Sequence, residues 1–308
     1  MTDAVDLAQL RRLEPDIETL LGYAGQVEVI HRGPFYALLS RDTDWANFAV
    51  PEDPRAGATD TAGAVGDLRR LFAQHGRSLR FVFKQPLYPA LAPLLEQEGL
   101  RLKQRQPLMI CTPTSFRPLD NPDVSVRFLQ VSDSDAALAA FQTIWSESLD
   151  DGSWRPTPEA LSDFRAELTR GGNRSTALAR HDGTPVGTGF IAYSKESFVL
   201  MRIATDPPAR RMGAGAAMTT FLTREGFARG RTIGWLSAED TRAQALYEKL
   251  GFSHAGDELS YEEAAEDGFS VASSGFREAT NEEGTPANPE LGDLVCSPFL
   301  SRLLPLPF

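Results

Sequence analysis

The segment 203–216 constrains the fold of this chain more than any other. It reads Ile-Ala-Thr-Asp-Pro-Pro-Ala-Arg-Arg-Met-Gly-Ala-Gly-Ala, and we predict a short strand, a turn and a glycine-containing loop that opens a helix. Gly213 and Gly215 let the backbone approach a ligand without a Cβ in the way. The first turn of a helix has N–H groups without intrahelical partners, at the positive end of the helix dipole. An anion such as a pyrophosphate would suit this position, although a helix start with small residues for close packing has the same pattern.

A strand and a helix with defined ends are predicted directly downstream. Residues 232–238 form an apolar run typical of a strand. After it, Asp240 or Thr241 can cap the start of a helix, with Thr241 and Gln244 forming a capping box. Gly251 stands where a helix commonly ends in a left-handed turn. The order strand, loop, helix, strand, helix indicates an α/β protein.

These two segments resemble the signature segments of the GNAT family, the GCN5-related N-acetyltransferases. Arg210-x-x-Gly213-x-Gly215 matches the family's [Q/R]-x-x-G-x-[G/A] pyrophosphate loop. Ala243-x-x-Leu246-Tyr247-x-x-x-Gly251-Phe252 matches its A-x-x-[LF]-Y-x-x-x-G-F ending. The resemblance covers roughly 124–261 and implies an α/β (α+β) fold with a mixed, mostly antiparallel sheet and helices on both faces.

The wider pattern agrees with that fold. We predict strands at 124–129, 175–180, 186–193 and 198–205, and helices at 134–147 and 158–170, from apolar spacing and end signals. The sequence His181-Asp182-Gly183-Thr184 is a hairpin signal between two of those strands.

The resemblance implies acetyl-coenzyme A as donor and direct transfer to an amine. The strand that contains Ile203 and Thr205 would hold the pantetheine arm through its backbone, and its N–H groups could polarise the thioester carbonyl. Tyr247 stands at the family's general acid, and a phenol with a pKa of about 10 suits protonation of the departing thiolate; a packing residue on an amphipathic helix is the alternative. The residues expected to contact acetyl-CoA are Ile203, Ala204, Thr205, Arg210, Arg211, Met212, Gly213, Ala214, Gly215, Ala216 and Asp240.

Two positions depart from the family pattern. Asp240 replaces an asparagine that many members have seven residues before the tyrosine, and a carboxylate cannot donate the hydrogen bonds of an amide. Asp240 therefore also qualifies as a plain helix cap. The turn into the loop contains Pro207 and Pro208, which stiffen it and remove two N–H groups.

The sequence leaves the general base and the acceptor site open. Conceivable bases are Glu196, His181, Glu147 and Glu239, each of which also fits a solvated surface residue. The segment 149–156 lies between the first two predicted helices, where this fold usually faces the acceptor. Within it Asp150 and Asp151 could attract a cationic amine and Trp154 could provide a flat wall, or the segment is a polar surface loop.

Length and proline content indicate two domains. The chain has 308 residues, more than one core usually supports. Residues 116–123 form a proline-containing, extended linker. The sequence also contains an internal repeat. Phe83 lies 152 residues before Trp235, and Gly99 lies 152 residues before Gly251. In both copies of the repeat, we predict a strand, a helix, a glycine followed by an apolar residue, and a second strand.

We therefore interpret 1–115 as a degenerate GNAT-like domain and 124–262 as the catalytic domain. The first half lacks the glycine loop, and 51–66 is loop-like instead; we expect this half to bind no cofactor and to pack against the catalytic domain. Residues 263–308 are acidic and rich in Gly, Ser, Asn and Pro, which predicts disorder.

The composition of the chain limits which classes of partner and which cellular compartment we expect. The formal charge of −11 gives no electrostatic case for nucleic acid or an anionic membrane, and no apolar run is long enough to span a bilayer. Cys111 and Cys296 are too few for a disulfide framework or a metal site. We expect a cytoplasmic monomer or homodimer with an amine substrate and no metal. The alternative function is a non-catalytic module that binds acyl-CoA or a peptide and regulates another protein.

Overall fold

The computed structural model describes residues 6–13, 27–40, 47–53, 56, 61–149 and 155–263. Asp150, Asp151 and Trp154 of the expected acceptor loop, and the expected disordered tail from 264 onward, lie outside these residues. Within the described part of the chain, no helix is both long and apolar enough to cross a membrane.

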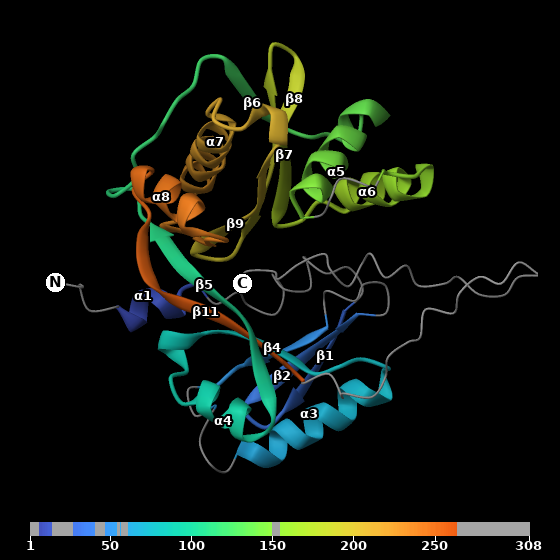
Figure 1. Cartoon of the computed structure of the whole chain (residues 1–308), viewed down its shortest axis with the longest axis vertical. Helices are drawn as coiled ribbons and strands as arrows, with labels where there is room; N and C mark the ends of the chain where they lie inside the picture. The colour runs from blue at the N-terminus through green and yellow to red at the C-terminus, as the bar shows by residue number, and fades with distance from the viewer. Residues whose placement is uncertain are drawn as a thin grey trace, which may run out of the picture.

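The chain forms two halves of similar element order (Figure 1). The N-terminal half contains α1 (Leu7–Arg11), β1 (Val27–Arg32), β2 (Phe35–Ser40), β3 (Phe48–Pro51), α3 (Ala62–Gln74), β4 (Arg80–Lys84), η2 (Gln85–Leu87), α4 (Leu91–Gln97) and β5 (Leu100–Cys111). The C-terminal half contains β6 (Val124–Phe128), α5 (Asp135–Leu149), α6 (Pro158–Arg170), β7 (Arg174–His181), β8 (Thr184–Tyr193), β9 (Ser197–Thr205), η3 (Pro207–Ala209), α7 (Ala214–Ala228), β10 (Ile233–Ser237), α8 (Thr241–Lys249) and β11 (Ser253–Glu263).

All of the strands join one sheet, in the order β1-β2-β3-β4-β11-β5-β10-β9-β8-β7-β6. Two neighbouring pairs, β3 with β4 and β9 with β10, are parallel, and the others are antiparallel. In each parallel pair a helix connects the two strands: α3 in the N-terminal half and α7 in the C-terminal half. The predicted α/β class with a mixed, mostly antiparallel sheet is confirmed.

The long strands β5 and β11 exchange between the halves. β11, the last described strand, lies between β4 and β5, and β5 in turn pairs with β10. Figure 1 shows both strands running from one half of the molecule into the other. The sheet of each half is therefore completed by a strand from the other half.

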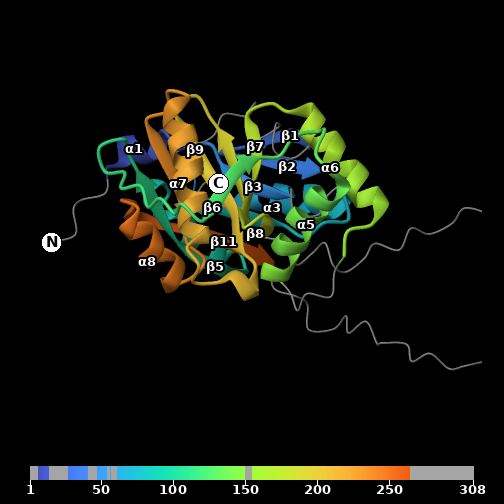
Figure 2. The ribbon, with the colours of Figure 1, turned by 90° about the horizontal axis from the view of Figure 1, so that it is seen from above.

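Helices cover both faces of the C-terminal sheet, as predicted (Figure 2). On one face α7 and α8 pack with Ala177, Ile191 and Phe198. On the other, α5 and α6 pack with Leu178, whose side chain alternates with that of Ala177 along β7. The period-two pattern of the strands thus assigns each side chain to one of two cores.

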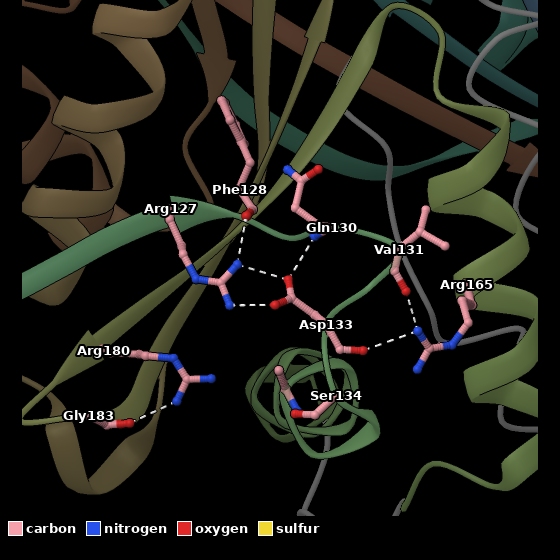
Figure 3. A network of polar contacts seen from close by, with 10 residues as sticks. Arg127, Phe128, Gln130, Val131, Asp133, Ser134, Arg165, Arg180 and Gly183 are labelled. Atoms are coloured by element: carbon pink, nitrogen blue, oxygen red, sulfur yellow. Dashed lines mark hydrogen bonds and ion pairs between the residues drawn. The ribbon is translucent and has the colours of Figure 1, made fainter.

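The turn that joins β6 to α5 is held by ion pairs and hydrogen bonds (Figure 3). Arg127 of β6 makes two bonds to the Asp133 carboxylate, at 2.8 and 2.6 Å, and Asp133 also accepts from the Gln130 N–H at 2.7 Å. From α6, Arg165 donates to the Asp133 carbonyl at 3.1 Å and also binds the Val131 carbonyl. Because these bonds tie β6 and α6 to the turn, they fix where α5 starts beside the sheet.

In the N-terminal half, one prediction needs correction. The interval 51–66 was expected to be loop-like, but α3 begins at Ala62, so its last residues are helical. The pattern Ala-Gly-Ala-Val-Gly is rich in small residues and conceals this start, because glycine weakens a helix without preventing it. Val65 and Leu68 of α3 are buried and supply the packing that overrides the propensity.

Residues 112–123, which connect β5 to β6, are docked on the C-terminal half. The Arg117 N–H donates to the Leu250 carbonyl at the end of α8, at 2.9 Å. Asp120 makes two bonds to Arg224 of α7, at 2.6 and 2.8 Å, and Asn121 donates to the Met212 carbonyl at 2.8 Å. The connection contains no helix or strand and is held along α7.

Candidate active site

The site begins where two parallel strands stop pairing. β9 and β10 are paired at Ser197, Phe198 and Val199 of β9, and the register ends there. β9 continues to Thr205 along β8, whereas β10 continues along β5 to Ser237. Among the described residues, nothing pairs with the β10 side of β9 from residue 200 onward. This stretch of β9 is an open edge inside the sheet.

The glycine loop lies at the end of that open edge. Gly213 adopts a left-handed φ of 83° directly before α7, and Arg211 also has a positive φ, of 69°. The first helical bond runs from the Ala217 N–H to the Gly213 carbonyl, at 3.0 Å. Within the described part of the chain, the N–H groups of 213–216 have no acceptor and no side chain caps the helix. This is the local geometry of an anion site.

The side chains around the loop leave its outer face open. Arg210, Arg211 and Met212 are exposed, whereas Ala214 is buried against the sheet. A Cβ on Gly215 would make ordinary contacts, at 3.5 Å, with Leu246 and Thr205. Gly213 is different, because a Cβ there would lie 2.7 Å from the Asn121 side-chain nitrogen. The structure thus brings together residues 203–205 and 210–216, which the sequence predicts to contact acetyl-CoA.

Tyr247 lies in the core that faces α7. It is 8% exposed and packs near Phe252, with ring centroids 6.0 Å apart. Its hydroxyl has no hydrogen-bond partner among the described residues. Burial raises the pKa of Tyr247 well above its usual value of about 10, and the charges of Glu239 and Asp240 add to the rise. The phenol is therefore protonated throughout the neutral range.

The start of α8 differs in part from the prediction. The Asp240 side chain caps the helix by accepting from the Ala243 N–H at 2.7 Å. The expected capping box of Thr241 and Gln244 is wrong, because the Gln244 side chain instead donates to Glu248 at 3.0 Å. Once Asp240 takes the capping position, Thr241 becomes the first helical residue, and its hydroxyl is no longer placed for the cap.

The four conceivable bases lie in different places. Glu196 is in the turn before β9, at the opposite end from the glycine loop, and binds Arg12 at 2.8 Å. His181 is at the tip of the β7–β8 hairpin, 3.6 Å from the Asp182 carboxylate. Glu239 is exposed just before α8, where it influences Tyr247. Glu147, on α5, has a side chain that is only 23% exposed and lies 3.4 Å from Arg155.

Asp206 is a candidate that the sequence reasoning missed. It follows the last residue of β9, and its N–H donates to the Val186 carbonyl at 3.0 Å. Desolvation raises the pKa of Asp206 above its usual value, the charge of Glu147 raises it further, and Arg210 opposes the rise. The available signal was an acidic residue standing directly between a buried strand and Pro207. An acid whose pKa is raised by desolvation and by a second carboxylate, at the end of a strand, is a candidate for a functional position.

The sequence reasoning also missed a group of polar residues on the strands beyond the open edge of β9. Lys84 and Glu258 are both buried and occupy paired positions on β4 and β11. The Ser237 hydroxyl, at the end of β10, donates to Glu258 at 3.1 Å, and the Lys84 ammonium lies 4.6 Å from the centre of the Trp235 ring. These residues come from both halves of the chain, so only the strand exchange brings them together.

Comparisons with known proteins agree with this geometry. Residues 138–252 match the model of the acetyltransferase (GNAT) family. A comparison with curated proteins finds no match. Among solved structures, a GCN5-related N-acetyltransferase from Kribbella flavida is similar, with a TM-score of 0.62 and 22% identity over 81% of this chain and 96% of that one.

Two further structures are similar over most of their length. A GCN5-related N-acetyltransferase from Sphaerobacter thermophilus has a TM-score of 0.57 and 14% identity, covering 75% of this chain and 76% of that one. A tandem GNAT protein from the clavulanic acid biosynthesis pathway has a TM-score of 0.56 and 13% identity, covering 76% and 79%. At these identities the similarity shows a shared fold.

Proposed function

Because residues 138–252 form a GNAT-family acetyltransferase domain, we propose that the protein transfers the acetyl group of acetyl-CoA directly to a primary amine of a small molecule, peptide or protein. The observation that carries the proposal is the open edge of β9, which ends at a helix start with unpaired N–H groups. Family and fold support acyl transfer in general. The donor, the direct transfer and the amine are the finer parts of the proposal.

Acetyl-CoA as the donor fits the residues of the β9 edge and of the glycine loop. An extended chain can add to a free strand edge through backbone hydrogen bonds, and the amides of a pantetheine arm would use 200–205 of β9 in this way. The N–H groups of 213–216 would hold the pyrophosphate, with Arg210 adding positive charge. When bound, the thioester supplies an activated acyl carbon.

A bulge in β9 would supply further backbone groups for that carbon. The register with β8 shifts between Thr188 and Phe190, and opposite the shift Arg202 has a φ of 52°. Bulges leave backbone groups outside the ladder, and we assign the Ile203 N–H to the developing oxyanion. Donors fixed before the reaction stabilise such charge without reorganisation.

Tyr247 and Asp206 have complementary proton roles in this proposal. Tyr247 keeps its proton at neutral pH and would give it to the departing thiolate sulfur. Asp206, whose pKa is raised by desolvation and by Glu147, would accept the proton that the substrate ammonium must lose to become the neutral amine that attacks the acyl carbon. A carboxylate whose pKa is closer to neutrality is a better general base.

We also propose that the N-terminal half is a degenerate GNAT-like domain without a donor site of its own. Its α3 connects parallel strands as α7 does, yet no left-handed glycine precedes it: Thr61 stands there, with a φ of −91°. The half contributes β5 to the catalytic sheet. One acetyl-CoA per chain is the expected stoichiometry, and two would contradict this.

Calorimetric titration with acetyl-CoA, followed by thiol release with a panel of amines, tests the function. Saturable binding together with amine-dependent release supports the enzyme. Binding without release from any amine favours the regulatory module, and no binding by the folded protein would refute the donor site. Gly213→Ala should lose acetyl-CoA binding. Gly183→Ala is its matched control, because both glycines have a left-handed φ, of 83° and 78°, but Gly183 lies in the β7–β8 hairpin.

A further inference from the structure

The bulge in β9 turns one charged side chain toward a particular face of the sheet. Along β9, Phe198 and Leu200 pack in the core that faces α7, and Val199 and Met201 pack in the opposite core. Strict alternation would return Arg202 to the α7 face. Instead Ile203 packs there, and Arg202 shares the face of Met201. The left-handed backbone at Arg202 is the point where the alternation breaks.

The guanidinium of Arg202 is held between two aromatic rings. Its central carbon lies 5.6 Å from the Phe190 ring centre and 5.9 Å from that of Trp145 on α5. Rings at this distance attract the cation. The Arg202 carbonyl is held separately, by a 3.0 Å bond from the Thr188 hydroxyl. Both the side chain and the backbone of Arg202 therefore have partners that restrain them.

No protein carboxylate is bonded to this guanidinium. Among the described residues, Arg202 makes no ion pair and its side-chain N–H groups have no acceptor. Glu167 is near enough to act on it electrostatically, but its carboxylate lies 3.6 Å from Arg174. Desolvation lowers the pKa of Arg202, yet an arginine stays charged at neutral pH. A fixed, partly buried cation without a bonded anion is costly unless a ligand supplies one.

We propose that Arg202 binds a carboxylate carried by the amine acceptor, so that the substrates are amino-acid-like amines. The inference rests on the proposed function, because it places the acceptor on the α5 face of β9. Arg202 is adjacent to Ile203, the residue assigned to the acyl carbonyl, so a carboxylate here would hold a nearby amine close to the reacting carbon. The planar fork of arginine matches a carboxylate with two parallel bonds.

The test uses amino acids and their carboxamides as matched pairs, with the full-length protein. We expect kcat/KM to be about 10- to 100-fold higher for the carboxylate member of the preferred pair, the range of a charged hydrogen-bonded contact. In Arg202→Gln this ratio falls to about 1, whatever the variant does to the carboxamide rate itself, because the ratio compares two substrates in the same protein. Arg202→Lys keeps part of the preference. Arg70→Gln, an exposed residue of α3, is the control.

Direct binding separates this inference from the proposed function. Trp145 fluorescence, assigned by difference from Trp145→Phe, is followed while the same pairs are added without acetyl-CoA. Saturable carboxylate binding that Arg202→Gln weakens at least 10-fold supports the inference even if acetyl-CoA fails to bind. Equal use of both members of every pair, an unchanged ratio in Arg202→Gln, or no carboxylate response overturns it.

A carboxylate on the acyl chain of the donor is the other source of the same chemistry. Succinyl-CoA is therefore compared with acetyl-CoA in both proteins. If Arg202→Gln loses only the use of succinyl-CoA and keeps its acceptor ratio, the assignment to the acceptor is wrong. If both proteins use the two donors in the same proportion while the acceptor ratio collapses, the assignment is supported.

Discussion

Asn121 donates a 2.8 Å hydrogen bond to the carbonyl oxygen of Met212, and this bond anchors the connection between the halves beside the glycine loop. The same amide fills the space next to the Cα of Gly213. The conformation of the loop therefore depends on a residue that the family's loop motif does not include. This arrangement makes Gly213 the most sensitive position of the loop.

We expect Gly213→Ala to weaken acetyl-CoA binding at least tenfold and to destabilise the protein by about 1–2 kcal/mol, because a Cβ disfavours the left-handed backbone. Calorimetry and thermal unfolding measure the two effects. Gly183→Ala has a similar backbone cost, with no atom within 4 Å of the added Cβ, and should leave binding intact. Equal loss of binding in both variants would mean that the effect is one of stability alone.

Tyr247→Phe should lower kcat by about 100-fold with little change in acetyl-CoA affinity, since it removes the acid and keeps the ring. The protonated phenol is the active form, and its pKa lies above 10. Tyr247 should therefore cause no alkaline loss of kcat between pH 7 and pH 10. Steady-state kinetics check both points, and wild-type rates in Tyr247→Phe would rule out the acid role.

Glu147→Gln should move the acid limb of the kcat/KM profile to lower pH. Asp206 acts in its deprotonated form, and the charge of Glu147 helps to hold the pKa of that carboxyl above its usual value. Removing the charge lowers that pKa, so the base is available at lower pH. The shift is partial, because desolvation is the larger cause. An acid limb that stays in place, or that survives in Asp206→Asn, would assign the base elsewhere.

A fragment of residues 118–308 should not fold alone. It lacks β5, the strand that pairs with both β10 and β11. Circular dichroism and thermal unfolding of the fragment test this, and co-expression with residues 1–117 should restore a soluble complex. A fully active, soluble fragment would contradict the shared sheet and the role assigned to the N-terminal half.

Local elements of the C-terminal half could be predicted closely from the sequence. The predicted helix 158–170 is α6 at the same bounds, and the strand expected at 198–205 is β9. These segments have strong periodicity and clear end signals such as Pro158 and Gly171. The glycine loop was located for the same reason, because its chemistry is encoded in adjacent residues.

The partners of β5 and β11 could not be predicted. Strand pairing depends on backbone hydrogen bonds that any residue can make, so alternation indicates a strand but not its neighbour. The lone Arg202 in an apolar run was visible, but its bulge follows from the register against β8. Asp206 and Glu147 are close only because α5 lies against β9. These parts of the site are tertiary, and local patterns do not contain them.

The position of β11 has a consequence for how the molecule is made. β4 and β5 are consecutive in the chain, yet they are not neighbours in the sheet, because residues 253–263 lie between them. During synthesis, the edges of β4 and β5 that pair with β11 have no such partner until about 150 further residues have been added. Synthesis proceeds at about 5–20 residues per second. Contacts that span so much sequence slow folding. The growing chain thus spends several seconds or more with exposed strand edges, the period in which a chaperone would protect it from aggregation.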